Sequence, residues 1–408
     1  MTYLKGLNVE GETFKYSTAV LTLYIAYLPI STALAGFITS SSIQSLIAVF
    51  YIMLSFVEII ISRKIEFNKK LIPIYIYFLY MISTGLWNRE FALDWYSMQF
   101  IVTFLIIVSV SIRSYSDVEL KLIGFALYSS IFIALISSLF SSFFHGGRMY
   151  IEIYSLMDPN DFSSGLAIAF ALCLIELLKK KKIILNAVCL LIVLGIVYLS
   201  GSRGGLLTMM CIIFVWILSI KGRAKYIVLT SIFVSAAAFL ICAEMGIGPS
   251  QISRFSVSAL ISGGGTGRSE IWKAAMEYFV TQSPLRMMFG NGLGSFADTV
   301  NYVAPGNDFT YESHNMYINT LIEGGVSGLA FLISCFTVLY MHAFKRKNLL
   351  GILALTGFII TGISLDTQVY RTFAIAAAMA LIWHDTDMDL MNGKSLKDCF
   401  AKKTEKFN

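Results

Sequence analysis

The sequence SIQSLIAVFYIMLSFVEIIIS at residues 42–62 is apolar over nearly its whole length and contains one charged residue, Glu58. About 20 apolar residues form a helix long enough to cross a hydrocarbon core of ~30 Å. The segment that follows, RKIEFNKK at 63–70, is rich in Lys and Arg. Short basic segments of this kind are retained on the cytoplasmic side of a membrane. The stretch therefore predicts a membrane-spanning helix that ends in the cytoplasm.

Apolar blocks of similar length recur along the chain. Of the 408 residues, 57% are hydrophobic and 14% are charged, whereas about a quarter of the residues of a soluble domain are charged. We predict an all-α fold, a polytopic membrane helical bundle with about twelve transmembrane helices. The expected spans are 18–38, 42–62, 71–87, 94–112, 120–144, 161–178, 183–200, 206–220, 226–245, 326–344, 349–365 and 371–384.

The distribution of positive charge predicts the topology. The net charge of +6 lies in short runs between apolar blocks, which argues against nucleic acid as a partner. With the N-terminus inside, every even-numbered connection is basic, as expected of cytoplasmic loops. Both termini are therefore expected in the cytoplasm. No cleavable signal peptide is expected, because the first apolar block is long enough to stay in the membrane. The basic connections are 63–70, 113–121, 179–182, 221–225 and 345–347.

One long segment interrupts this regular pattern. We expect transmembrane helices 1–9 in residues 1–245, a long extracytoplasmic loop in 246–325, transmembrane helices 10–12 in 326–384 and a cytoplasmic tail in 385–408. Within the loop, GRSEIWKAAMEYFV at 267–280 has apolar residues at helical spacing. This pattern predicts an amphipathic helix that rests on the membrane or on the bundle.

Arginine dominates the cations expected on the outer side. Seven of these eight residues are Arg, whereas Lys predominates in the inner segments. The planar guanidinium group pairs with phosphate through two hydrogen bonds, and Lys provides only a point charge. The set indicates an anionic, phosphate-bearing substrate at the outer face. The alternative is that Arg side chains snorkel at the interface. The residues are Arg89, Arg148, Arg203, Arg254, Arg268, Lys273, Arg286 and Arg371.

Two of these arginines lie in glycine-rich segments. Arg203 lies in SGSRGG (200–205), where the bare backbone would let a bulky anion approach the start of the next helix. The alternative is a flexible interhelical turn. Arg268 ends GGGTGR (263–268) and begins the amphipathic helix, where a cation opposes the helix dipole unless an anion is also bound. The alternative is a solvated charge.

His314 lies in YESHN (311–315), where the long loop returns to the membrane. Asn315, Asn319 and Glu323 follow on one face of a helix, and polar groups at membrane depth must face a cavity or another protein group. A neutral His at such a position can act as a general base for a sugar hydroxyl. The alternative is a capping residue at the interface.

The remaining polar motifs are expected to be structural. GNGLG (290–294) lacks the strand–turn–helix context of a nucleotide-binding motif and predicts tight turns. Asp158 is expected to start the sixth span, and Asp366 and Arg371 flank the last outer turn and could pair. The Cys, His and carboxylate residues have neither disulfide nor metal-ligand spacing, so neither a metal nor another cofactor is expected.

Taken in order, four motifs resemble the O-antigen ligase/polymerase superfamily of bacterial envelope glycan assembly. They are DPNDFSSGLA, SGSRGG, TGRSEIW and SHNMYINTLIEGGVSG, within residues 158–330. The resemblance implies a helical-bundle, GT-C-like glycosyltransferase that uses an undecaprenyl-diphosphate-linked glycan at the outer face of the bacterial inner membrane, without metal or nucleotide sugar.

The same resemblance implies roles for four residues. Arg203 and Arg268 would bind the diphosphate and stabilise it as the leaving group, and His314 would accept the proton of the acceptor hydroxyl. Arg371 is a candidate third phosphate contact.

Three activities fit these features. A Wzy-type polymerase transfers the growing glycan to the next lipid-linked repeat unit. It is favoured because GNGLGSF ahead of TYESHN looks more like the sequences of polymerases and capsule polymerases than like those of ligases. It would work beside a chain-length regulator protein. An O-antigen ligase, which transfers the glycan to the lipid A core, shares the motifs. A lipid-linked glycan flippase is disfavoured because the two halves of the chain do not resemble each other and the spans carry few ionisable residues.

Overall fold

The computed structural model describes residues 7–9, 12–31, 33, 43–62, 65, 67–87, 95–144, 148–153, 156–220, 222–248, 250–262, 268–303, 312–365 and 371–384. Helices dominate this part of the chain, and strands are confined to a short hairpin and a small three-stranded sheet. The predicted all-α fold class is therefore confirmed.

Seven helical stretches in the described residues are long and apolar enough to cross a membrane. They contain α2 (Ile43–Ser62), α3 (Ile72–Thr84), α5 (Asp117–Ser137), α6 and α7 (Pro159–Gly165 and Ala167–Leu178), α8 (Ile183–Ser200), α10 (Ala224–Glu244) and α15 (Met316–Lys345).

Five further apolar helices are shorter. They are α1 (Tyr16–Ala26), α4 (Trp95–Ser111), α9 (Arg203–Ser219), α16 (Leu349–Thr361) and α17 (Arg371–Ile382). Each of the longer and shorter helices overlaps one predicted span. The chain is thus a polytopic membrane protein, while the exact number of spans stays a prediction.

The structure corrects the end of the fifth predicted span. Helical structure after α5 stops at Phe140, and residues 141–144 form strand β3 (Ser141–Phe144). Serine side chains compete for backbone hydrogen bonds and aromatic residues favour strands, which explains the change at this Ser-Ser-Phe-Phe sequence. Strand β3 pairs antiparallel with β4 (Arg148–Glu152), and β4 pairs with β5 (Leu156–Met157). A second sheet, the hairpin β1–β2 (Leu7–Val9 and Glu12–Phe14), precedes α1.

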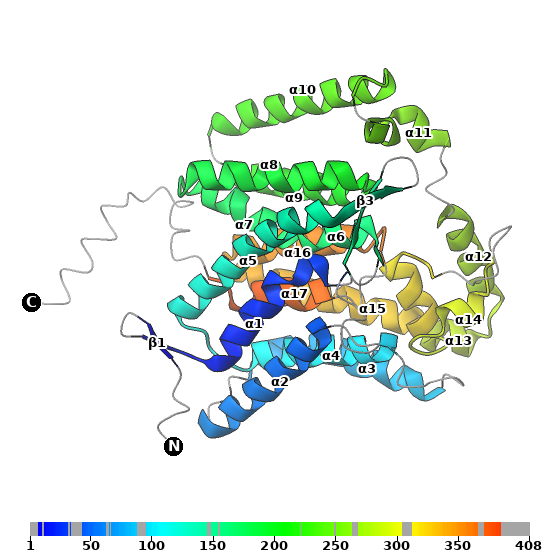
Figure 1. Ribbon diagram of the computed structural model, residues 1–408. Helices are drawn as coiled ribbons and strands as arrows, with labels where there is room; N and C mark the ends of the chain where they lie inside the picture. Colours follow the sequence, from blue (N-terminus) through cyan, green and yellow to red (C-terminus); the bar gives the residue numbers. More distant parts are fainter. Residues whose placement is uncertain are drawn as a thin grey trace, which may run out of the picture.

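Helix α17 lies at the centre of the bundle (Figure 1), between the α2–α4 layer and the α7–α9 layer. All residues from Phe373 to Ile382 are buried. The Ala-rich sequence permits close packing, since a Cβ atom at Gly351 of α16 would lie 2.6 Å from the Cα atom of Ala380. Phe373 stacks on Phe358 with 4.6 Å between ring centroids. These contacts pack α17 against α16, which in turn packs against α7 and α9.

A buried ion-pair cluster joins α1, α2 and the α4–α5 connection. The Arg113 guanidinium lies 2.6 Å from a Glu119 oxygen and 3.4 Å from a Glu58 oxygen. The hydroxyl groups of Ser17 and Thr18 on α1 also accept hydrogen bonds from its terminal nitrogens. Paired and hydrogen-bonded in this way, the charges can remain buried.

The chain between α10 and α15 forms short helices at one end of the bundle. Figure 1 shows α11 (Val257–Ser262), α12 (Arg268–Thr281), α13 (Pro284–Phe289) and α14 (Phe296–Val300) at the end opposite to β1. Ile271, Ala275 and Phe279 of α12 are buried against Phe296 and Ile322. The predicted amphipathic helix therefore rests on the bundle. Met276 and Val280, also in its expected apolar stripe, are exposed.

Candidate functional site

The turn between α8 and α9 positions Arg203. Gly201 ends α8 in the left-handed conformation, at φ 58°, which glycine adopts without strain. The Ser202 hydroxyl accepts a hydrogen bond from the Gly205 N–H at 2.9 Å and donates one to Asn160 Oδ1 at 2.7 Å. Arg203 is consequently the first residue of α9, three residues before the predicted span of 206–220, and α6 fixes the turn from the side.

The Arg203 side chain contacts the segment that follows α10. Its Nε donates to the carbonyl oxygen of Arg254 at 2.9 Å, and its Nη2 donates to that of Ala259 at 3.4 Å. Its hydrogen-bond partners among the described residues are therefore backbone carbonyl groups. Within the described ranges, no carboxylate lies at ion-pairing distance from this guanidinium.

A hydrogen bond links the helix of Arg268 to the segment of His314. Arg268 begins α12, and the indole Nε1 of Trp272, one turn later, donates to the carbonyl oxygen of Ser313 at 2.8 Å. The glycine-rich residues 263–267 that precede Arg268 lie outside the described residues.

His314 lies in a tight bend before α15. Its φ is 47°, in the left-handed region. The Ser313 hydroxyl accepts a hydrogen bond from the Asn315 N–H at 3.0 Å. The Asn315 side chain caps α15 by accepting from the N–H groups of Tyr317 and Ile318. Asn315 is thus the cap of α15. His314, which the sequence analysis considered as a possible capping residue, does not cap this helix.

Burial and the positive charge of Arg268 lower the pKa of His314, and the negative charge of Asp158 opposes this shift. The imidazole is therefore neutral at pH 7 and can accept a proton. Burial also lowers the pKa of Arg268, with Asp158 opposing and Arg148 adding to the shift. These four groups consequently interact electrostatically at one place in the fold.

Asp158 has two roles in this arrangement. As predicted, it begins the sixth helix: its carboxylate caps α6 by accepting from the Asn160 N–H at 2.7 Å. It also acts on both Arg268 and His314, which the sequence analysis did not anticipate. The available signal was its place in the DPNDFSSGLA motif, which the resemblance groups with SGSRGG and the motifs of Arg268 and His314.

Arg371 occupies a different, more enclosed position. At the start of α17 it is 6% exposed, and it donates to Gln44 Oε1 at 3.1 Å and to Ser45 Oγ at 3.2 Å. It also interacts electrostatically with Asp161, which in turn interacts with Asp158. The expected partner Asp366 lies outside the described residues. Arg371 therefore joins α17 to α2, and Asp161 and Asp158 link it electrostatically to the other site residues.

The polar stripe on α15 faces another helix. Asn319 Nδ2 donates to the Tyr96 hydroxyl of α4 at 2.8 Å and to Glu323 Oε1 at 3.2 Å. The Tyr96 hydroxyl donates to Glu323 Oε2 at 3.4 Å. The sequence allowed these polar groups to face either a cavity or another protein group. In the structure they bond to protein groups.

The GNGLG segment docks where α15 breaks. Gly325 has φ 67° and ψ −169°, which interrupts the helix. The N–H groups of Asn291 and Gly292 donate to the carbonyl oxygens of Ile322 and Glu323 at 3.0 and 2.8 Å. The segment makes turns, as predicted, and also supplies hydrogen bonds that the broken helix would otherwise lack.

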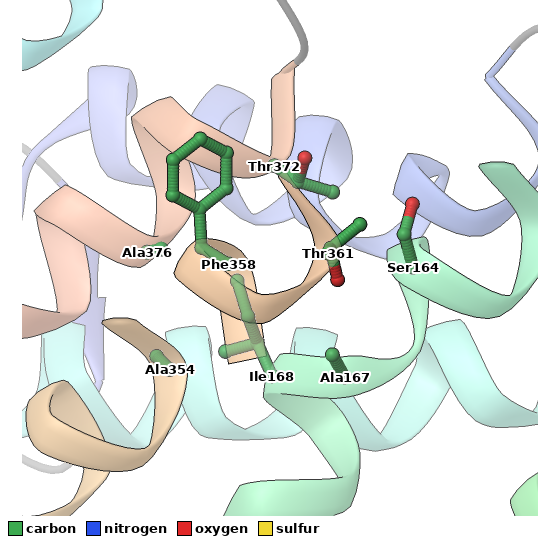
Figure 2. A pocket seen from close by; sticks show the side chains of 8 residues that line it. All are labelled: Ser164, Ala167, Ile168, Ala354, Phe358, Thr361, Thr372 and Ala376. Atoms are coloured by element: carbon green, nitrogen blue, oxygen red, sulfur yellow. The ribbon is translucent and has the colours of Figure 1, made fainter. Parts of the chain in front are cut away.

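A small cavity lies in the core near α17. Figure 2 shows its lining side chains, which come from α6–α7, α16 and α17 and include Ser164, Phe358, Thr361 and Thr372. Its volume of about 10 Å³ accommodates no more than a single water molecule. The described residues contain no group of three His, Cys, Asp or Glu able to hold a metal ion.

The fold and this site define a polytopic helical membrane protein with an arginine-rich, histidine-containing site in the connections at one end of its bundle. A family model described as O-antigen ligase matches residues 187–333. The match confirms the resemblance to the O-antigen ligase/polymerase superfamily, and it includes Arg203, Arg268 and His314 but not Arg371. A search of curated proteins found no match to the chain.

Proposed function

We propose that the protein is a polysaccharide polymerase that transfers a growing glycan from undecaprenyl diphosphate to the next lipid-linked repeat unit. The observation that carries the proposal is the interaction of a neutral His314 with Arg268, on two segments joined by the Trp272–Ser313 hydrogen bond. A proton acceptor beside a cation suits a reaction in which a hydroxyl attacks and an anion leaves.

In the proposed reaction, the acceptor sugar hydroxyl gives its proton to the imidazole of His314. Its oxygen forms a bond to the anomeric carbon of the donor glycan, and the bond from that carbon to the diphosphate oxygen breaks. Undecaprenyl diphosphate leaves with the electron pair, and Arg203 and Arg268 stabilise its charge. The proton passes from His314 to water, which restores the neutral base. The proposed reaction uses no metal and no nucleotide sugar.

Arg371 is proposed as a third residue that acts on the phosphate, less directly than Arg203 and Arg268. Its guanidinium is buried and already bonded to Gln44 and Ser45. It fits a role in which it holds α17 in place beside the site and adds positive potential there.

The proposed location is the bacterial inner membrane, with both termini in the cytoplasm and the site at the outer face. The basic connections of the sequence support this topology. A chain-length regulator protein is the expected partner, since polymerases of this kind usually act beside one.

Complementation of a deletion strain tests the proposal. R203A, R268A and H314A should each insert into the membrane yet abolish long glycan chains. R286A is the matched control: Arg286 is also half-buried and also binds a backbone carbonyl, that of Gly290, at 3.3 Å. Normal chain lengths in all three site variants would rule the proposed site out.

A second candidate function is that of an O-antigen ligase, which the description of the matching family favours. Gel analysis of glycan from the deletion strain separates the two. One capped repeat unit on each lipid A core indicates a polymerase, whereas uncapped cores with long chains left on the lipid carrier indicate a ligase. If the protein were a flippase, it would form no longer glycan chains in a cell-free assay of chain elongation.

A further inference from the structure

Two arginines that the proposed reaction does not use lie over the α8–α9 turn beside Arg203. A Cβ atom at Gly201 would lie 3.1 Å from the Cδ and Nε atoms of Arg254 and 3.2 Å from the Cγ atom of Arg148. The side chains of both arginines therefore pass directly over this glycine. Arg148 comes from strand β4 and Arg254 from the segment after α10, so three separate parts of the chain bring arginines to one turn.

Backbone hydrogen bonds hold the three guanidinium groups in place. Arg148 Nε donates to the Ser200 carbonyl oxygen at 3.2 Å, and Arg254 Nε donates to that of Gly201 at 3.4 Å. Arg203 Nε donates to the carbonyl oxygen of Arg254. The Arg148 guanidinium also lies 5.6 Å from the ring centroid of Tyr150. The protein's own backbone thus positions the three side chains.

The terminal nitrogens of Arg148 and Arg254 have no hydrogen-bond partner among the described residues, and no described carboxylate pairs with either group. Both residues are half-buried. Three cations that repel one another at a half-buried position are stabilised when an anion lies between them. Consistent with this, burial and the charges of Arg148 and Arg203 lower the pKa of Arg254.

We propose that Arg148 and Arg254, together with Arg203, form a preorganised binding site for a phosphate group of the lipid diphosphate. A guanidinium whose Nε is already bonded to the protein still presents its terminal nitrogens to phosphate oxygens. Arg148 also interacts electrostatically with Arg268, so it connects this site to the one that contains His314. The inference rests on the proposed function, because it assigns two further residues to that substrate.

Binding of a short-chain prenyl analogue tests the inference independently of catalysis. The full-length protein in phosphatidylcholine nanodiscs is titrated with geranylgeranyl diphosphate and geranylgeranyl monophosphate. Wild type should bind the diphosphate more tightly than the monophosphate. R148Q and R254Q should each weaken diphosphate binding about tenfold, which is typical for loss of a charge-assisted hydrogen bond. R286Q, the matched control on the same side, should bind within about twofold of wild type.

R148K and R254K test whether weaker binding in the Gln variants could result from misfolding. Each keeps the positive charge but loses the fork of donors, so affinity should fall between those of wild type and the Gln variant. Diphosphate affinity in R148Q and R254Q equal to that in R286Q would overturn the inference. Equal competition by phosphatidylglycerol would also overturn it, because the cluster would then bind any phosphate headgroup.

The inference and the proposed function can fail separately. If R268A and H314A abolish glycan elongation while R148Q and R254Q bind the diphosphate like wild type, the inference fails and the function stands. If R148Q and R254Q lose the diphosphate but wild type never elongates a lipid-linked glycan, the binding site stands and the function fails.

Discussion

The indole N–H of Trp272 donates a hydrogen bond to the carbonyl oxygen of Ser313, with 2.8 Å between nitrogen and oxygen. Trp272 lies four residues after Arg268, on the same face of α12. Ser313 directly precedes His314. One hydrogen bond thus sets the position of the helix that carries the cation relative to the bend that carries the proposed base.

We predict that W272F slows glycan transfer about fivefold, since the variant keeps an aromatic ring but loses a hydrogen bond that contributes about 1 kcal/mol. The rate is measured as chain elongation on a lipid-linked acceptor in membranes. W216F is the matched control, because Trp216 Nε1 makes a similar bond to the Leu174 carbonyl at 2.9 Å, between α9 and α7. Equal rates in both variants would show that the Trp272 bond does not position the site.

The break in α15 leads to a second prediction. A Cβ atom at Gly325 would lie 2.5 Å from the carbonyl carbon of Met288 and 2.6 Å from the Gly290 nitrogen, and the backbone there is in a region that only glycine adopts readily. We expect G325A to destabilise the protein by about 2–4 kcal/mol. Its thermal unfolding midpoint in detergent should fall clearly below that of wild type.

Gly195 provides the control for this substitution. It lies within α8, and a Cβ atom there would have no neighbour within 4 Å. G195A should leave the midpoint unchanged or raise it, since alanine favours helix by about 0.5–1 kcal/mol. A wild-type midpoint in G325A would mean that the break in α15 is not fixed by its contact with the GNGLG segment.

A third prediction concerns pH. Asp158 opposes the lowering of the His314 pKa, so removing its charge should lower that pKa further. In D158N, the acid limb of the rate profile should therefore move to lower pH, because the base stays neutral over a wider range. Asn keeps the helix cap, so α6 should begin at the same residue. A shift of the acid limb to higher pH would contradict the electrostatic relation between Asp158 and His314.

The buried ion-pair cluster away from the site gives a fourth prediction. R113L leaves the Glu119 and Glu58 carboxylates without their cation, and side chains of Arg113 and Glu119 are only 2% and 3% exposed. We expect a loss of about 3–5 kcal/mol, seen as poor recovery of folded protein from membranes. K273A removes an exposed pair, at 77% and 68% exposure, and should change stability by less than about 0.5 kcal/mol. Similar recovery of both variants would mean that the cluster contributes little.

Much of the helical architecture could be predicted because membrane-spanning length and apolar composition are local properties. The helices at Ile43–Ser62 and Ile183–Ser200 have nearly the bounds expected for 42–62 and 183–200. The strand at Ser141–Phe144 could not be predicted, because it depends on pairing with β4. Likewise, nothing local indicated that Arg371 bonds to Gln44 and Ser45, which lie more than 300 positions away.

The site was only partly predictable for the same reason. Glycines around Arg203 and the loop position of His314 are visible in the sequence, and they led to the choice of these residues. The relation of Asp158 to His314, and the convergence of Arg148 and Arg254 over Gly201, join segments that are far apart along the chain. Their roles in substrate binding stay predictions until the variants are measured.

The sequence by itself determined that this is a helical membrane protein with arginines concentrated between its spans, because hydrophobic length and charge act residue by residue. Only the tertiary structure decided which arginines meet, which carboxylate acts on His314 and where α15 breaks. Electrostatic and hydrogen-bond interactions depend on distances of a few ångströms, and folding alone sets those distances between remote parts of a chain.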